Sequence, residues 1–99
     1  MTTTIGLEEH AWIPDLRDAL VNAPATTRDD SLAMFNRGER LTRLLDLGDQ
    51  RIRHMDNAGI DVQVLSITTP GTQSLPPSDA IRLARDANDQ LAAAVAAHP

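Results

Sequence analysis

The chain has 99 residues, of which 41% are hydrophobic and 23% charged, and this is the composition of an ordinary soluble domain with a modest core. Its formal net charge is −5 and its nine basic residues are all arginines, so it lacks the clustered basic face typical of nucleic-acid or membrane-surface binding. There is no cysteine, no apolar run of the roughly 18 residues that a membrane span needs, and no signal-peptide pattern, so we expect a cytoplasmic protein.

Residues 4 to 10 are predicted to form a short strand that ends in acids and a histidine. Strand side chains alternate between two faces. One face would carry Thr4, Gly6, Glu8 and His10, and the other Ile5, Leu7 and Glu9. We expect the first face to line the crowded interior of a closed barrel and the two apolar residues to contact surrounding helices. Pro14 is expected to end the extended segment and begin a loop.

The middle of the chain changes from irregular to helical. Residues 15 to 37 are broken by Pro, Asn, Asp and Gly and are expected to form a loop, with a short helical piece at Asp15 to Val21. A helical pattern starts near Glu39, is interrupted at Gly48 and resumes at Asp49, which is expected to be either the N-cap or a first-turn acid. Gly59 stands where a left-handed helix end is expected.

The last part predicts a second strand and a long helix. Residues 60 to 68 are β-branched and almost continuously apolar, which favours a strand covered on both faces. After a Pro- and Gly-containing loop, Ser78 is the expected N-cap of a helix from Asp79 to about Ala97. The predicted apolar stripe of this helix is Ile81, Ala84, Asn88, Leu91 and Val95.

Strands alternating with helices predict a parallel α/β sheet with right-handed crossovers. Two strands alone make no stable parallel sheet, so we expect either the opening portion of a larger α/β protein or a piece that assembles with partners. Glu8 and His10 would then converge at the carboxyl-terminal mouth of a barrel strand, where a carboxylate and an imidazole suit Zn²⁺, Mn²⁺ or Fe²⁺. The alternative is a solvated strand end, because a catalytic metal site needs three or more protein ligands.

Other candidates favour structural roles. His54, inside a helix, is expected to be a surface or packing residue. Trp12, Pro14 and Phe35 would line either a substrate pocket or a small core of their own. The strand-end hydroxyls and Asn88 are expected to make structural hydrogen bonds. The strand-end hydroxyls are those of Ser66, Thr68 and Thr69.

Four segments together resemble a known family. They are "IGLEEHAWIP" (5 to 14), "GDQRIRHMDNAGIDVQVLS" (48 to 66), the following "TTPGTQ", and "ARDANDQLAAAVAAHP". In this order they resemble the metal-dependent aromatic-acid decarboxylases of the amidohydrolase superfamily. These include the γ-resorcylate (2,6-dihydroxybenzoate) and 2,3-dihydroxybenzoate decarboxylases, with the aminocarboxymuconate-semialdehyde decarboxylases as more distant relatives.

The resemblance implies a (β/α)₈ barrel roughly three times as long as this chain, of which residues 1–99 would be the N-terminal part, about two βα units of a single domain. Glu8 and His10 match the first two ligands of one divalent metal, Zn²⁺ or Mn²⁺. A His and an Asp from later strands would complete the shell, and that Asp would protonate the ring carbon before CO₂ departs. The resemblance also implies decarboxylation of a small substrate, an aromatic or related unsaturated carboxylic acid, and a homo-oligomer at full length.

Two alternatives stay open. One is a metal-dependent hydrolase on the same scaffold, acting on an ester, lactone or amide. The other is a non-catalytic fragment or interaction module. Residues 1–99 alone are expected to be inactive, because they carry only part of the implied metal shell.

Overall fold

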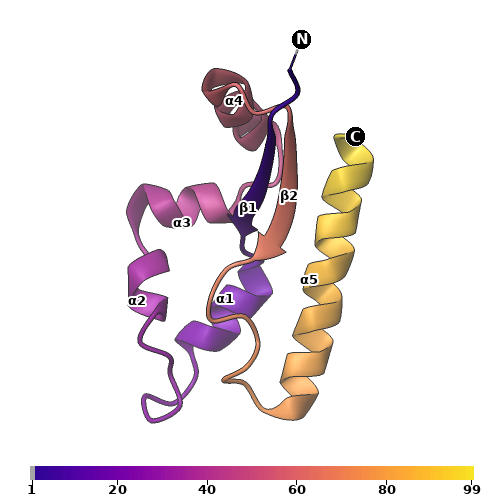
Figure 1. Cartoon of the computed structure of the whole chain (residues 1–99). Helices are drawn as coiled ribbons and strands as arrows, with labels where there is room; N and C mark the ends of the chain where they lie inside the picture. Colours follow the sequence, from indigo (N-terminus) through magenta and orange to yellow (C-terminus); the bar gives the residue numbers. More distant parts are fainter. Residues whose placement is uncertain (1) are drawn as a thin grey trace.

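A parallel pair of strands lies at the centre of the computed structural model, which describes residues 2–99 (Figure 1). The strands are β1 (Ile5–Ala11) and β2 (Val62–Ile67). Between them run four helices, and a long helix follows β2. The four are α1 (Pro14–Val21), α2 (Leu32–Phe35), α3 (Gly38–Leu45) and α4 (Asp49–Ala58), and the last is α5 (Pro77–Ala97). The predicted parallel α/β architecture is confirmed.

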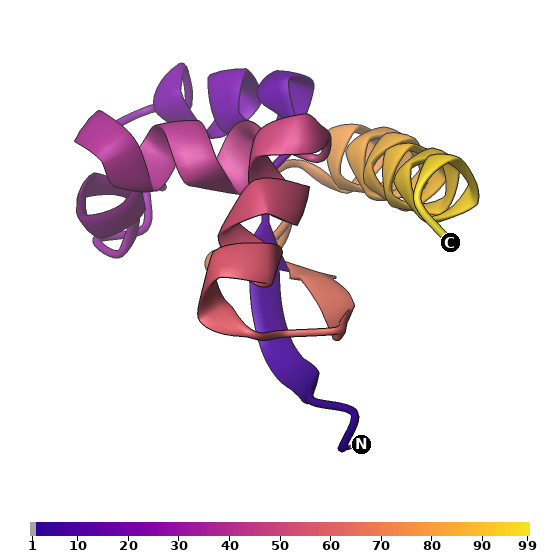
Figure 2. The ribbon, with the colours of Figure 1, turned by 90° about the horizontal axis from the view of Figure 1, so that it is seen from above.

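The helices form an arc around the strand pair, with α3 on one side and α5 on the other (Figure 2). In Figure 1 both strands run towards α1, which lies beyond their carboxyl ends. None of the helices within residues 2–99 is long and apolar enough to cross a membrane.

The segment after β1 is more helical than the sequence indicates. Pro14 does not begin a loop: it is the first residue of α1, where its fixed φ suits the helix and its missing N–H would be unpaired in any case. The predicted helical piece at Asp15 to Val21 is confirmed, whereas the one-turn helix α2 falls in the stretch expected to be irregular.

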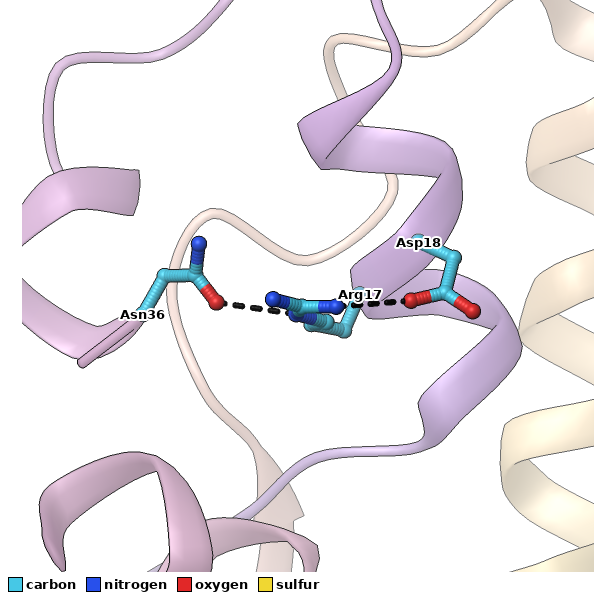
Figure 3. A network of polar contacts seen from close by, with 3 residues as sticks. All are labelled: Arg17, Asp18 and Asn36. Carbon is cyan, nitrogen blue, oxygen red and sulfur yellow. Dashed lines mark hydrogen bonds and ion pairs between the residues drawn. The ribbon is translucent and has the colours of Figure 1, made fainter. Parts of the chain in front are cut away.

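Side-chain hydrogen bonds hold this segment against α1. The Arg17 guanidinium donates to Asn36 Oδ1 at 2.8 Å and contacts Asp18 Oδ1 at 2.9 Å, so it links α1 to the residue that follows α2 (Figure 3). Arg28 donates to the carbonyls of Val21 and Ala23 at 3.0 and 2.9 Å, at the end of α1. Charged donors thus satisfy carbonyls that the end of a helix leaves free.

The helix ends around α4 follow the sequence. Asp49 lies in its first turn, and Gly59 has φ +73° at its carboxyl end, as predicted. The Ile60 N–H donates to the Met55 carbonyl at 2.9 Å, which closes the helix in the way that a left-handed glycine permits.

The core lies between α1, α3 and α5. Trp12 is fully buried in it, and Phe35 packs against it, so both aromatic residues belong to the core rather than to an open pocket. Pro14 is exposed. The buried members are Trp12, Ile13, Leu16, Leu20, Leu32, Leu44, Leu83 and Ala87.

Two predictions for α5 are wrong. The helix begins at Pro77 with Pro76 as its N-cap, so Ser78 lies inside the first turn. Its buried residues are Leu83 and Ala87, whereas Ile81 and Val95 are 56% and 59% exposed and Asn88 is exposed. Alanines surround this helix on several sides, so the apolar pattern allows more than one stripe, and packing against α1 selects the face of Leu83.

The prediction that β2 is covered on both faces is also wrong within residues 2–99. Its residues alternate between exposed and half-buried, and Val62 and Val64 are 46% and 49% exposed. One face of the strand pair therefore lies open, although the sequence of β2 is apolar on both faces.

Candidate metal site

A register shift interrupts the pairing of β1 with β2. Gly6 is paired with Gln63 and Glu9 with Leu65, so β1 uses two residues, Leu7 and Glu8, where β2 uses only Val64. One extra residue on one strand is a β-bulge, and it changes which side chains share a face.

The bulge reverses the expected facing of the first half of β1. Gly6 lies on the same face as Glu9, and a Cβ added at Gly6 would collide with the Glu9 carboxylate. Ile5 and Leu7 are 52% and 72% exposed, so they do not contact helices as the alternation predicted. Strict alternation fails because the extra residue shifts every later side chain by one position.

The strand pair accordingly has two different faces. The open face carries exposed side chains, and the helix-covered face carries half-buried or buried ones. The open face consists of Ile5, Leu7, His10, Val62, Val64 and Ser66. The helix-covered face consists of Gly6, Glu9, Ala11, Gln63, Leu65 and Ile67.

His10 lies near the carboxyl end of β1, on the open face and beside Ser66 of β2. Its Nδ1 is 3.1 Å from Ser66 Oγ. When Nδ1–H donates to that oxygen, Nε2 keeps its lone pair free for another partner. A metal-binding histidine is typically held in this way by a hydrogen bond at its second nitrogen.

Glu8 is exposed in the bulge, opposite Val64 of the open face. Its carboxylate and the His10 imidazole are donors that suit a divalent cation. Within residues 2–99, no three His, Cys, Asp or Glu side chains form a group that could hold a metal ion. The two donors fit part of a metal shell, and a catalytic shell needs at least one more protein ligand.

The helix-covered face carries a different set of charges. Glu9 is half-buried there and lies near Arg51 of α4. Burial lowers the pKa of the Arg51 guanidinium, and the Asp46 and Glu9 carboxylates oppose this by raising it. Arg51 was not singled out from the sequence. The available signal was its position four residues before Met55, on the strand-facing side of the predicted helix.

The other candidate residues lie on α4 and at the end of β2. His54 is exposed on α4. Thr68 is 1% exposed, and its N–H donates to the Ala11 carbonyl at 3.0 Å. Its buried hydroxyl has no hydrogen-bond partner within residues 2–99, so the structural hydrogen bond expected of this side chain is not found. Ser66 has the contact with His10 that the sequence could not predict, and Thr69 is exposed.

Parallel strands joined by helices, with metal-donor side chains at the strand ends, are the class of structure from which (β/α)₈ metal-dependent enzymes are built. The chain is 39% identical over 101 aligned residues to the γ-resorcylate decarboxylase of Rhodococcus jostii and 37% identical to that of Rhizobium radiobacter. These alignments cover 100% of this chain, which spans about 28% of the length of the curated relatives it matches. No family model matches the chain.

Solved structures show the same likeness. The 5-carboxyvanillate decarboxylase of Novosphingobium aromaticivorans, complexed with manganese and 4-hydroxy-3-methoxy-5-nitrobenzoic acid, matches 98% of this chain and 31% of its own, with a TM-score of 0.89 and 33% identity. A 2,6-dihydroxybenzoate decarboxylase complexed with 2,6-dihydroxybenzoate has a TM-score of 0.70 and 37% identity, and the match covers 100% of this chain and 28% of that one. The fold is therefore that of part of a decarboxylase barrel, and the resemblance read from the sequence is confirmed: along its whole length the chain is homologous to these decarboxylases.

Proposed function

We propose that residues 1–99 form the N-terminal part of a single barrel domain, and that the complete protein is a metal-dependent decarboxylase of a hydroxylated aromatic carboxylic acid. The main support for this proposal is the homology of the whole chain to decarboxylases of this kind. The structure of one of them was solved with manganese and a substituted benzoic acid. The relatives are decarboxylases, and no feature of this chain favours the hydrolase alternative.

Glu8 and His10 are the proposed metal ligands of this chain. Three features support this assignment: both residues are exposed near the carboxyl end of β1, His10 has Nδ1 engaged by Ser66, and the carboxyl ends of barrel strands are where active sites lie. A bound divalent cation would act as a Lewis acid and template for the carboxylate and the neighbouring hydroxyl of the substrate. Manganese in the solved relatives favours Mn²⁺ over Zn²⁺.

Glu8 supplies negative charge that lowers the cost of holding a cation at the open face, and Ser66 orients the imidazole. The apolar side chain of Val64, opposite the bulge that contains Glu8, would exclude water around the bound ring. The homo-oligomeric state and the cytoplasmic location stay predictions.

The first test is metal content in the complete protein. We expect about one equivalent of Mn²⁺ or Zn²⁺ in the unsubstituted protein and near-complete loss in Glu8→Ala and in His10→Ala, because each removes a direct ligand. Elemental analysis after gel filtration measures this. The control, His54→Ala, is expected to keep its metal.

Activity is read in the same samples as loss of 2,6-dihydroxybenzoate and release of CO₂. Stoichiometric metal in the Glu8/His10 double variant would exclude the assigned site. A metal-loaded protein that decarboxylates none of a panel of hydroxybenzoates would contradict the proposed activity while leaving the metal site in place.

A further inference from the structure

Arg51, in the first turn of α4, joins four parts of the chain through one side chain. Nε donates to the Asp46 carbonyl at 2.6 Å, and Nη1 donates to Gln63 Oε1 of β2 at 3.2 Å. Nη2 donates to the His10 carbonyl at 3.0 Å and to the Arg43 carbonyl at 3.1 Å. A planar guanidinium with several donors allows this arrangement, which the single ammonium of lysine does not reproduce.

The surroundings keep Arg51 charged while partly removing it from water. Burial lowers its pKa, but the Asp46 and Glu9 carboxylates compensate in part. Glu9 lies on the helix-covered face with its carboxylate over Gly6, and a Cβ at Gly6 would force that carboxylate to move. The hydrogen bonds of Arg51 are therefore charge-assisted and stronger than those between neutral groups.

The bond to His10 reaches the strand from the side opposite to its imidazole. His10 follows the bulge at Leu7 and Glu8, where the ladder with β2 is interrupted. A bulge weakens local pairing, so the backbone just after it depends more on other anchors. Arg51 provides such an anchor at the residue whose imidazole lies beside Ser66.

We propose that Arg51 is a positioning residue for the metal site, which acts by fixing the main chain of His10 from the helix-covered face. The inference rests on the proposed function, because it takes His10 as a metal ligand. Arg51 has no hydrogen bond to the His10 imidazole or to the Glu8 carboxylate. Its effect on the proposed ligands is transmitted through the main chain of His10.

Shorter side chains at position 51 are not expected to overpack their surroundings. Arg51 lies in the wall of an open pocket of about 640 Å³ between α3, α4 and the strands, so water can take the place of lost atoms. Arg51→Lys keeps the charge and loses the forked geometry, whereas Arg51→Gln loses the charge. Arg53, exposed two residues further along α4, offers matched controls in Arg53→Lys and Arg53→Gln.

The experiment measures the Mn²⁺ dissociation constant of the complete protein by competition with a chelator. We expect binding to weaken by about 10- to 100-fold in both Arg51 variants, the usual effect of removing a partner that supports a ligand, and to stay unchanged in both Arg53 variants. Circular dichroism and thermal melting of the metal-free proteins report folding separately. A lower melting temperature with an unchanged dissociation constant would show a purely structural role and overturn the proposal.

Two further outcomes decide the remaining cases. If both Arg51 variants fail to fold, the variant Gln63→Met tests the inference, because it removes one hydrogen-bond acceptor of Arg51 and keeps the length of the side chain at position 63. We expect the Mn²⁺ dissociation constant of this variant to increase by a few-fold. An unchanged dissociation constant would overturn the inference. Metal retained in Glu8→Ala and His10→Ala would overturn the proposed function and this inference together. Metal lost there, with Arg51 variants binding normally, would overturn the inference alone.

Discussion

At the scale of single residues, Ser66 of β2 contacts the imidazole of His10 on β1. Its hydroxyl lies 3.1 Å from His10 Nδ1, and the two residues are 56 positions apart in the chain. When His10 Nδ1–H is the donor, the bond leaves the Nε2 lone pair free, and it limits rotation of the ring. Ser66 therefore supports the proposed ligand from the open face, as Arg51 does from the helix-covered face.

We expect Ser66→Ala to weaken Mn²⁺ binding by about tenfold in the complete protein, because the imidazole loses its orienting partner. The measurement is a chelator competition titration. Thr69→Ala removes a hydroxyl from an exposed residue shortly after β2 and should bind metal normally. Equal affinities of Ser66→Ala and the unsubstituted protein would mean that the hydrogen bond does not orient His10 for metal binding.

At the scale of elements, the junction between α4 and β2 fixes where the second strand begins. Gly59 has φ +73°, and the Ile60 N–H reaches the Met55 carbonyl at 2.9 Å. A Cβ at Gly59 would meet no atom within 4 Å. Any cost of a side chain there arises from the left-handed backbone and not from a clash.

Gly59→Ala is expected to lower the free energy of unfolding by about 1 kcal/mol, because an L-residue in the left-handed region is strained. Gly59→Asn should lose less, since asparagine tolerates this region better. Urea unfolding of the complete protein measures both. If the alanine variant proved as stable as the glycine form, the junction would have to adopt another conformation in solution.

At the scale of the whole molecule, the 99-residue chain is elongated and open on one side. Its radius of gyration is 14.4 Å, and its extents are 50 × 25 × 19 Å. A compact chain of this length would have a radius of gyration of about 13 Å. The open face exposes four apolar side chains, two on β1 and two on the adjacent strand β2. They are Ile5 (52%), Leu7 (72%), Val62 (46%) and Val64 (49%).

We expect the 99-residue chain, produced by itself, to self-associate, because unpaired strand edges and a contiguous apolar face are sites of aggregation. Multi-angle light scattering measures its mass. The double variant Leu7→Lys/Val64→Lys places charge on the open face and should reduce association. A monomer that unfolds cooperatively would contradict this expectation.

By itself, the sequence determined the local features of this protein. The apolar periods predicted both strands and the helices α3, α4 and α5 in their right order, although not α2. Gly59 marked the end of α4, and the four family-like segments pointed to the decarboxylases. These predictions succeed because each depends on residues close together in the chain. The placement of Glu8 and His10 at the end of β1 was likewise readable from a single segment.

Only the tertiary structure decided which side chains meet. The bulge at Leu7 and Glu8 exists only through the pairing of β1 with β2, and it turned Ile5 and Leu7 away from the helices. The contacts of His10 with Ser66 and Arg51 join residues 56 and 41 positions apart. The buried stripe of α5 was fixed by packing against α1. Such contacts depend on register and packing between distant segments, which the pattern of one segment does not encode.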